Sequence, residues 1–384
     1  MDVRVPYLQP ESWDSTMPER LRWLRENEPV YWSEPDNLWV LTKYADVENV
    51  SKHQEIFTSA QGVRPGTPAK IGLIDEGEPR HAQLRRLINR GFTPRMVAKL
   101  EETFLSITTD AIDSVAAAGE CDFVTSIAVP LPLMLIAEMM GIGRADYPRF
   151  HRWSDDMIQA DGSKDPAVMA KAGMAFMEYS TYLRRIIEDR RANPIEDLVS
   201  ILTGAKDGGM LTQFQHADSV GLGGEHAGVA NDELLMLLTI LLVAGNETTR
   251  NGISGGMQLL IENPGERQKL IENPSLIPAA VEEMVRMVSP VHSFSRTVLE
   301  DTAIRGKAIR KGQSVLMVYP SANRDTEVYD DPDTFRVDRN PTHLGFGVGR
   351  TSASARTWRA WRCASPSSSS CAACPTWSTA PAAR

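Results

Sequence analysis

The chain has 384 residues, of which 42% are hydrophobic and 24% are charged, as is usual for a globular protein. Its net charge of −9 argues against nucleic acid as the main partner, and its four cysteines, three of them after residue 360, do not indicate a disulfide framework. The N-terminus lacks a basic segment followed by an apolar core, so we expect no secretory signal and no membrane anchor, and a soluble, cytoplasmic protein. No linker or repeat precedes residue 350, which favours one large domain.

The first part of the chain alternates predicted helices with a short hairpin. TMPERLRWLREN (16–27) predicts a helix capped by Thr16, the segments around SEPDN (30–32 and 38–41) predict a hairpin, and 44–53 predicts another helix. In EPRHAQLRRLINRGFTP (78–94), a helix would place His81 and Arg85 on one face, at i and i+4. A solvated basic face explains this pair on charge alone.

The rest of the chain predicts mostly helices, followed by short strands. Helices are expected at 95–118, 131–160 and 166–191, a turn or helix at 195–203, and further helices at 232–262, 264–271 and 275–288. The stretch 204–231 is rich in Gly and polar residues, and a loop this long is either functional or disordered. Strand-like pieces at 295–298, 302–304 and 314–318 follow, so the fold class is mainly α with minor β.

The segment 234–256, LLMLLTILLVAGNETTRNGISGG, is the centre of the chain. Its apolar run, 234–244, is shorter than the roughly 20 residues that span a bilayer, so it predicts a buried helix. Gly245, Glu247 and Thr248 then place a gap, an acid and an alcohol within that helix. This combination suits the binding of a small molecule and the movement of protons. The alternative is a threonine that bonds back to its own i−4 carbonyl.

Five motifs, in this order along the chain, together resemble the bacterial cytochromes P450, the soluble heme-thiolate monooxygenases. They are HAQLR (81–85), AGNETT (244–249), EEMVR (282–286) followed by Arg296, PDTFRVDR (332–339), and HLGFGVGR (343–350). The resemblance runs from about residue 10 to residue 350 and predicts a P450 domain over 1–350.

The resemblance implies a role for each motif. Glu247 and Thr248 would relay protons to dioxygen, and Ala244 and Gly245 would leave room for it. His81, Arg85 and Arg296 would hold the propionates of heme b, while Phe346 and Gly347 belong to the loop that presents the axial cysteine. Glu283, Arg286 and Arg339 would form a buried ion network. The implied reaction hydroxylates an apolar small molecule (a steroid, terpenoid or fatty-acid-like compound) with dioxygen and electrons from a ferredoxin and its reductase. Plain core packing explains each candidate pocket residue better when it is taken singly; together they would line an apolar cavity, and they are Leu73, Ile74, Leu241, Leu242, Val291 and Phe294.

The chain departs from the family pattern after Arg350. The family continues with His-x-Cys-x-Gly, but here Ala353 occupies the position of the cysteine, and Ala cannot bind iron. The residues from 351 to 384 contain no Asp, Glu, Leu, Ile or Val, so they cannot build a core helix or strand and are predicted to be disordered. Neither Cys363 nor the Cys371-x-x-Cys374 pair has the further ligands that a metal site needs, so no metal-binding residue is assigned.

The codons of the tail suggest a frameshift. Shifted back by one base, they permit HFCLGANLARMEMRVTFEQLLRRVPDL, which restores the cysteine loop and an amphipathic helix. We therefore expect a single-base deletion at the Gly349–Arg350 codons, an incomplete C-terminal part of the P450 fold, impaired heme binding and an inactive chain. The alternative is a non-catalytic P450-like pseudoenzyme or truncated gene product.

Overall fold

The computed structural model describes residues 2–65, 73–92, 94–160, 163, 165–205, 207–208 and 229–349. Most of the 204–231 segment and all of the 351–384 tail lie outside the described residues, so the predictions made for them are not addressed by the structure. The chain divides into two compact units, which are described separately: unit 1, made of Met1–Ala69 and Asn251–Arg384, and unit 2, Lys70–Arg250. The single P450 domain over 1–350 stays a prediction. Among the described helices, none is both long enough and apolar enough to cross a membrane.

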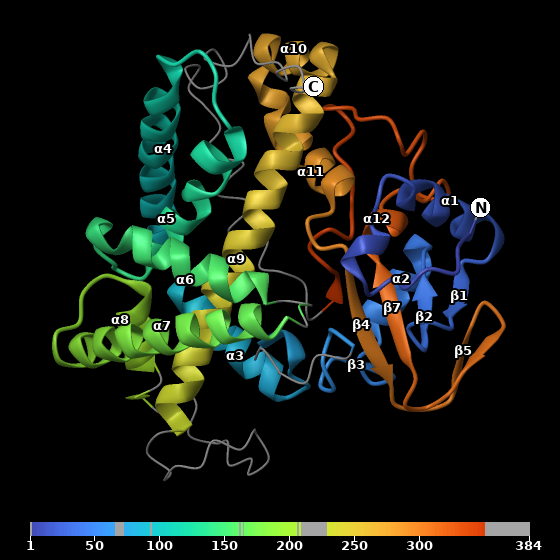
Figure 1. The fold of residues 1–384 in the computed structure, drawn as a ribbon, viewed down its shortest axis with the longest axis horizontal. Helices are drawn as coiled ribbons and strands as arrows, with labels where there is room; N and C mark the ends of the chain where they lie inside the picture. The colour runs from blue at the N-terminus through green and yellow to red at the C-terminus, as the bar shows by residue number, and fades with distance from the viewer. Residues whose placement is uncertain are drawn as a thin grey trace. The chain divides into compact units, whose positions relative to one another are not determined.

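Unit 1 is built on a five-stranded sheet in the order β1-β2-β7-β4-β3 (Figure 1). Its strands are β1 (Val30–Ser33), β2 (Leu38–Leu41), β3 (Phe57–Thr58), β4 (Ser293–Val298) and β7 (Ser314–Val318). All neighbours are antiparallel except β2 and β7, which run parallel. A second ribbon pairs β5 (Thr302–Ile304) with β6 (Lys307–Ile309). The predicted hairpin is confirmed, whereas β3 and β6 were not predicted.

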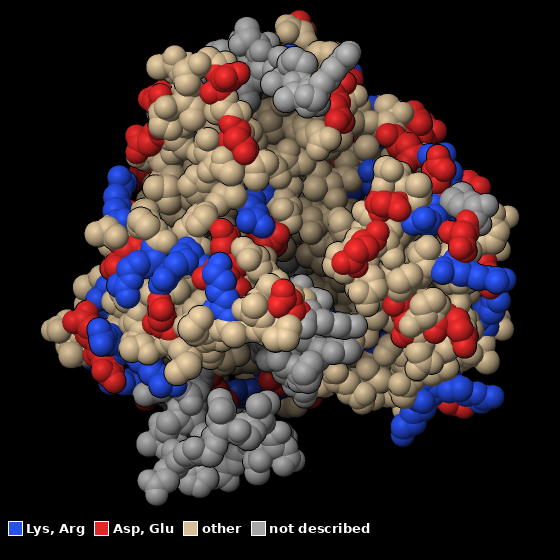
Figure 2. Space-filling model, in the orientation of Figure 1, with Lys and Arg blue, Asp and Glu red and all other residues tan. Residues whose placement is uncertain are grey.

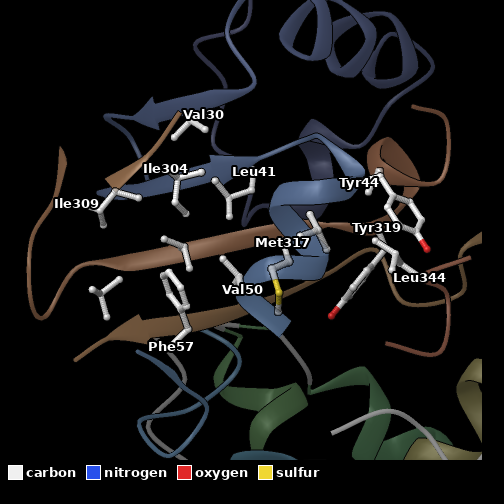
Figure 3. Close-up of a cluster of buried hydrophobic side chains, with 14 of the residues drawn as sticks. Val30, Leu41, Tyr44, Val50, Phe57, Ile304, Ile309, Met317, Tyr319 and Leu344 are labelled. Carbon is white, nitrogen blue, oxygen red and sulfur yellow. The ribbon is translucent and has the colours of Figure 1, made fainter. Parts of the chain in front are cut away.

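Alternate residues of the strands point to opposite faces of the five-stranded sheet, and apolar side chains pack on both faces. Leu41 and Met317 pack beneath helix α2 (Tyr44–Lys52) with Phe57, Ile304 and other apolar side chains (Figure 3). On the other face, Val40 and Leu316 pack with residues of helix α1 (Met17–Asn27). The strand β4, which carries Arg296, joins this sheet beside β7 and contributes Val298 and Phe294 to the cluster beneath α2.

Thr16 precedes α1 but does not cap it with its side chain, so that prediction is wrong. The Thr16 hydroxyl instead donates to the Asp14 carboxylate. Thr16 has φ −92° and ψ −12°, so it lacks the extended backbone from which a capping oxygen usually accepts a bond from the first amides of the helix.

The remaining helices of unit 1 lie in its C-terminal part. They are α10 (Pro264–Glu272), α11 (Ile277–Val288) and the short α12 (Tyr319–Ala322), and α11 is preceded by a 3-10 turn, Pro274–Leu276. Apolar side chains of α10 and α11 pack against Phe335 and Val337. The long helix α9 (Val229–Glu262) belongs to unit 2 up to Arg250 and continues into unit 1.

Unit 2 is helical. It contains α3 (Arg80–Gly91), α4 (Pro94–Ala116), α5 (Pro130–Met139), α6 (Tyr147–Gln159), α7 (Pro166–Ala192), α8 (Leu198–Ala205) and the first part of α9. Short helical turns lie at Leu73–Asp75, Val124–Ala128 and Arg144–Asp146. Helices α6 and α7 lie side by side (Figure 1) around the buried ring cluster of Phe150, Trp153 and Tyr179.

The prediction of one helix over 131–160 is wrong, because α5 and α6 are separate helices. Gly141, between them, has a φ of +69°, which only glycine adopts readily. A side chain there would also clash, because a Cβ on Gly141 would lie 2.2 Å from Oδ2 of Asp197. Asp197 in turn is ion-paired with Arg190, whose Nη2 donates to the carbonyl of Gly141 at 3.0 Å. The break in the helix is therefore fixed by a charged pair from elsewhere in unit 2.

Candidate active site

The acid–alcohol segment lies in the middle of α9, as the sequence predicts, and belongs to unit 2. The Thr248 hydroxyl donates to the carbonyl of Ala244 at 2.7 Å, which is the i−4 bond of the alternative interpretation. Ala244 is exposed, and Gly245, Glu247 and Thr248 are half-buried. A Cβ on Gly245 would come within 3.1 Å of Ile136 Cδ1, so the glycine also permits close packing against α5.

Two partners of this segment were missed by the sequence analysis. The Glu247 carboxylate accepts a hydrogen bond from Arg250 Nη2 at 2.8 Å, and Arg250 Nη1 lies 3.6 Å from the Asp155 carboxylate of α6. Buried Asn246 donates to the buried Ser154 hydroxyl at 2.8 Å. The i, i+3 spacing of Glu247 and Arg250 was a usable signal. The two contacts to α6 are between residues far apart in sequence and could not be found from spacing.

Helix α3 carries the two predicted propionate ligands of unit 2. His81 is buried, and its Nδ1 lies 3.4 Å from the Glu78 carboxylate. Arg85 follows one turn later and is half-buried, and burial lowers the pKa of its guanidinium because desolvation disfavours the charged form. The neighbouring Arg80 pairs with Glu233 of α9, which ties the start of α3 to the central helix.

The third predicted propionate ligand, Arg296, lies on β4 in unit 1. It is buried, with only 4% of its surface exposed, and its Nη1 donates to the carbonyl of Ser295 at 2.8 Å. Buried Tyr319 lies close enough for the charge of Arg296 to act on its pKa, which burial raises and the cation lowers. The sheet thus holds a guanidinium where few water molecules can solvate it.

The predicted buried ion network of unit 1 is confirmed. Arg286 binds Glu283 through two parallel bonds, from Nε at 2.7 Å and from Nη2 at 2.8 Å, and both side chains are fully buried. Arg339 adds a bond from its Nε to Glu283 at 3.0 Å. The remaining guanidinium nitrogens donate to backbone carbonyls, among them those of Asn323 and Asp330. The network therefore ties α11 to the loop at 323–339.

The loop that would lead to the axial ligand follows this network. His343 is buried; its Nε2 lies 2.9 Å from the Glu282 carboxylate, and its Nδ1 accepts the Gly345 amide at 3.1 Å. The ring of half-buried Phe346 tilts against that of His343, with centroids 5.3 Å apart. Gly347 and Gly349 have φ values of +68° and +76°, which favour glycine. The Glu282 clamp on His343 was not predicted.

The candidate pocket residues divide between the two units. In unit 2, Leu242 is fully buried and is therefore plain core, whereas Leu73, Ile74 and Leu241 are half-buried. In unit 1, half-buried Val291 and Phe294 pack against the core cluster beneath α2.

The described residues include cations that suit the propionates of a heme, but no ligand for its iron. Half-buried Arg85 and buried Arg296 are cations in poorly solvated positions, and the anionic propionates would offset that cost. No described side chain is comparably placed to bind the iron. Cys121 is the one cysteine within the described residues, and it is exposed beyond α4. The same residues contain no cluster of three or more His, Cys, Asp or Glu side chains able to hold a metal.

Comparisons with known proteins agree with this architecture. A family model described as Cytochrome P450 matches residues 156–352. A steroid C26-monooxygenase of Mycolicibacterium smegmatis is 34% identical over 333 residues, covering 86% of this chain and 79% of that protein. Another, of Mycobacterium tuberculosis, is 36% identical over 331 residues, covering 85% of this chain and 78% of that protein.

The fold is also similar to solved cytochrome P450 structures. CYP109B1 from Bacillus subtilis superposes with a TM-score of 0.79 at 30% identity, covering 94% of this chain and 92% of that one. CYP109E1 from Bacillus megaterium, in complex with corticosterone, has a TM-score of 0.75 at 30% identity, covering 92% of this chain and 88% of that one.

Proposed function

Because the chain belongs to the cytochrome P450 family of monooxygenases, we propose that its in-frame form hydroxylates a steroid or a similarly apolar small molecule with dioxygen. The observation that supports this proposal is the name steroid C26-monooxygenase, which the two relatives from Mycolicibacterium smegmatis and Mycobacterium tuberculosis share. The electrons come from a ferredoxin and its reductase, and the reaction takes place in the cytoplasm. Terpenoid and fatty-acid-like substrates are the alternatives within the same apolar class.

The side chains described above would divide the work of binding and proton supply. His81, Arg85 and Arg296 hold the two propionates. When bound, heme supplies the activation of dioxygen, and a thiolate ligand favours cleavage of the O–O bond. Phe346 and Gly347 belong to the loop on the ligand side.

Proton supply falls to the acid and the alcohol of α9. Arg250 Nη2 holds the ionised Glu247 carboxylate at 2.8 Å. After taking up a proton from solvent, Glu247 would turn and pass that proton toward Thr248 and so return to the carboxylate. The Thr248 hydroxyl donates a hydrogen bond to the carbonyl of Ala244, so the free side of its oxygen can accept a hydrogen bond.

The chain as written departs from the family pattern throughout 351–384, and at one position in this tail the departure removes the iron ligand. Ala353 takes the place of the axial cysteine, so we propose that heme binding is impaired and that this chain is inactive. A single-base deletion at the Gly349–Arg350 codons accounts for both the missing cysteine and the composition of the tail. A second reading, a non-catalytic P450-like pseudoenzyme, rests on the same substitution and requires the deletion to be present in the genome.

A sequencing read of the source DNA across the codons for Gly349 to Ser354 separates these two readings. An extra base that restores the cysteine frame supports the monooxygenase, whereas a confirmed deletion supports the pseudoenzyme. The in-frame protein is then titrated with a steroid, a terpenoid and a fatty acid while the heme absorption spectrum is followed. A spectral change with the steroid at the lowest concentration supports the substrate proposal, and a preference for either of the other compounds contradicts it.

A further inference from the structure

A groove of about 660 Å³ opens on the surface of unit 2, between the start of α6 and the middle of α7. Its wall on α7 consists of six residues, Met177, Glu178, Thr181, Tyr182, Arg185 and Ile186. Asp146 and Arg149 close the other side. Lys and Arg side chains are intermixed with Asp and Glu side chains on the face that carries α6 and α7 (Figure 2). The groove therefore combines apolar surface with charges of both signs.

The groove is bordered by unusually exposed apolar side chains. Met177 is 71% exposed and Met174, three residues before it on α7, is 61% exposed. Methionine is flexible and fits irregular apolar surfaces, which makes it common where proteins bind one another. The exposed Met177 side chain beside the groove suggests that it fits into the equivalent groove of a second copy of the chain.

The six α7 residues are self-complementary when the helix is paired with an antiparallel copy of itself. If the two-fold axis passes between Thr181 and Tyr182, Met177 faces Ile186 of the partner and Glu178 faces Arg185 of the partner. Each contact then occurs twice, as two-fold symmetry requires. An apolar pair and an opposite-charge pair thus arise from a single register.

The charges of the groove suit this pairing. Arg185 is exposed and forms no ion pair with any described residue. The Glu178 carboxylate is held in place through Oε2, which accepts a hydrogen bond from Trp153 Nε1 at 2.8 Å and pairs with Arg152. An anion whose position is already fixed loses little side-chain entropy when a second cation approaches. On the other wall, Asp146 and Arg149 pair with each other and add no net charge.

We propose that this face binds a second copy of the chain, in a two-fold dimer formed by antiparallel α7 helices. Met177 of each copy enters the groove of the other, and two Glu178–Arg185 pairs lie beside the methionines. Because one helix crossing buries a small area, the dimer is weak and forms only at high protein concentration. This inference does not depend on heme or on the proposed monooxygenase activity.

Sedimentation of the full 384-residue chain over a range of concentrations tests the proposal. The unchanged chain should show a reversible monomer–dimer equilibrium. Met177→Lys, Arg185→Glu and Glu178→Lys should each weaken the dimer by at least about tenfold, because each removes an apolar contact or places like charges opposite one another. The matched controls, Met169→Lys and Glu188→Lys, change the same residue types on α7 outside the groove and should leave the equilibrium unchanged.

Mixing two variants gives the sharpest result. Arg185→Glu and Glu178→Lys each repel themselves, but a heterodimer of the two has opposite charges at both pairs, so the mixture should dimerise again. Recovery of the dimer supports the register. A chain that stays monomeric at all concentrations, a dimer that survives in each variant, or a mixture that does not recover would overturn it. Circular dichroism of each variant ensures that only folded protein is compared.

Discussion

Glu283→Gln is the most informative change to the buried ion network, because it keeps the shape of the side chain and removes its charge. Glu283 is fully buried and accepts two bonds from Arg286, at 2.7 and 2.8 Å, and one from Arg339 at 3.0 Å. It also accepts the backbone amide of Arg336 at 3.2 Å. A glutamine offers one acceptor oxygen, and its amide group would point a donor at a guanidinium.

The expected loss follows from the burial of the charges. Breaking a buried ion pair by removing one partner costs about 3–5 kcal/mol, because the remaining charge is left uncompensated. Total unfolding free energies are only about 5–15 kcal/mol. The substitution should therefore remove about a fifth or more of the stability and raise the unfolded fraction by about a hundredfold or more.

Urea denaturation followed by circular dichroism and tryptophan fluorescence measures this loss. The matched control is Lys307→Gln, which breaks the exposed Lys307–Glu28 pair of the same unit (3.1 Å) and should cost less than about 1 kcal/mol. A loss for Glu283→Gln that is no larger than the control would refute the reasoning, since it would mean that the network contributes no more than a surface pair.

Three further predictions concern packing, burial and pH. Gly255→Ala should cost about 1–3 kcal/mol in urea denaturation, because its Cβ would lie 2.8 Å from an α11 side chain, whereas Gly265→Ala meets open space and should cost nothing. Arg25→Met should cost no more than about 1–2 kcal/mol, because burial already disfavours the charge of Arg25 and lowers its pKa to about 10. The remaining cost comes from the lost bond to the buried Ser321 hydroxyl at 3.0 Å, and a loss of several kcal/mol would count against this reasoning. The hydrogen bond from Trp153 lowers the pKa of Glu178 from its ordinary value, so this carboxylate contributes stability that is present above the ordinary pKa and is lost as the pH falls through the lowered one. In melting curves from pH 6 to pH 3, Glu178→Gln should therefore lose less stability than the parent, and equal losses would contradict the assignment.

Helices and strands with a regular apolar pattern could be predicted from the sequence, whereas the interruptions could not. The break between α5 and α6 depends on Gly141 and on the Arg190–Asp197 pair, which approaches from a distant part of the chain. The strand β3 has only two residues, too few to show a periodicity. The three-residue β6 was missed although its partner β5, of equal length, was predicted. Thr16 has the right residue type for a cap and precedes the helix, but its backbone is helical rather than extended and its hydroxyl donates to Asp14.

In the candidate site, too, contacts within one helix were predictable from spacing, whereas contacts between distant segments were not. Glu283 and Arg286 are three residues apart on one helix, so spacing alone indicates that they pair, whereas the contribution of Arg339 came from the family resemblance. The contacts of Arg250 and Asn246 with α6 depend on how two helices pack, which no local pattern encodes. The arrangement of His81 and Arg85 on one face was predictable, but their role as propionate ligands stays a prediction.

The most direct test of the central claim is the absorption spectrum of the reduced, CO-treated protein. Three forms should be compared after incubation with heme: the chain as written, its Ala353→Cys variant, and the in-frame chain with cysteine at position 353. The in-frame chain should show the Soret band of a thiolate-ligated heme, and the chain as written should not. The variant separates loss of the ligand from loss of the rest of the C-terminal part. A thiolate-type band from the chain as written, or none from the in-frame chain, would contradict the account.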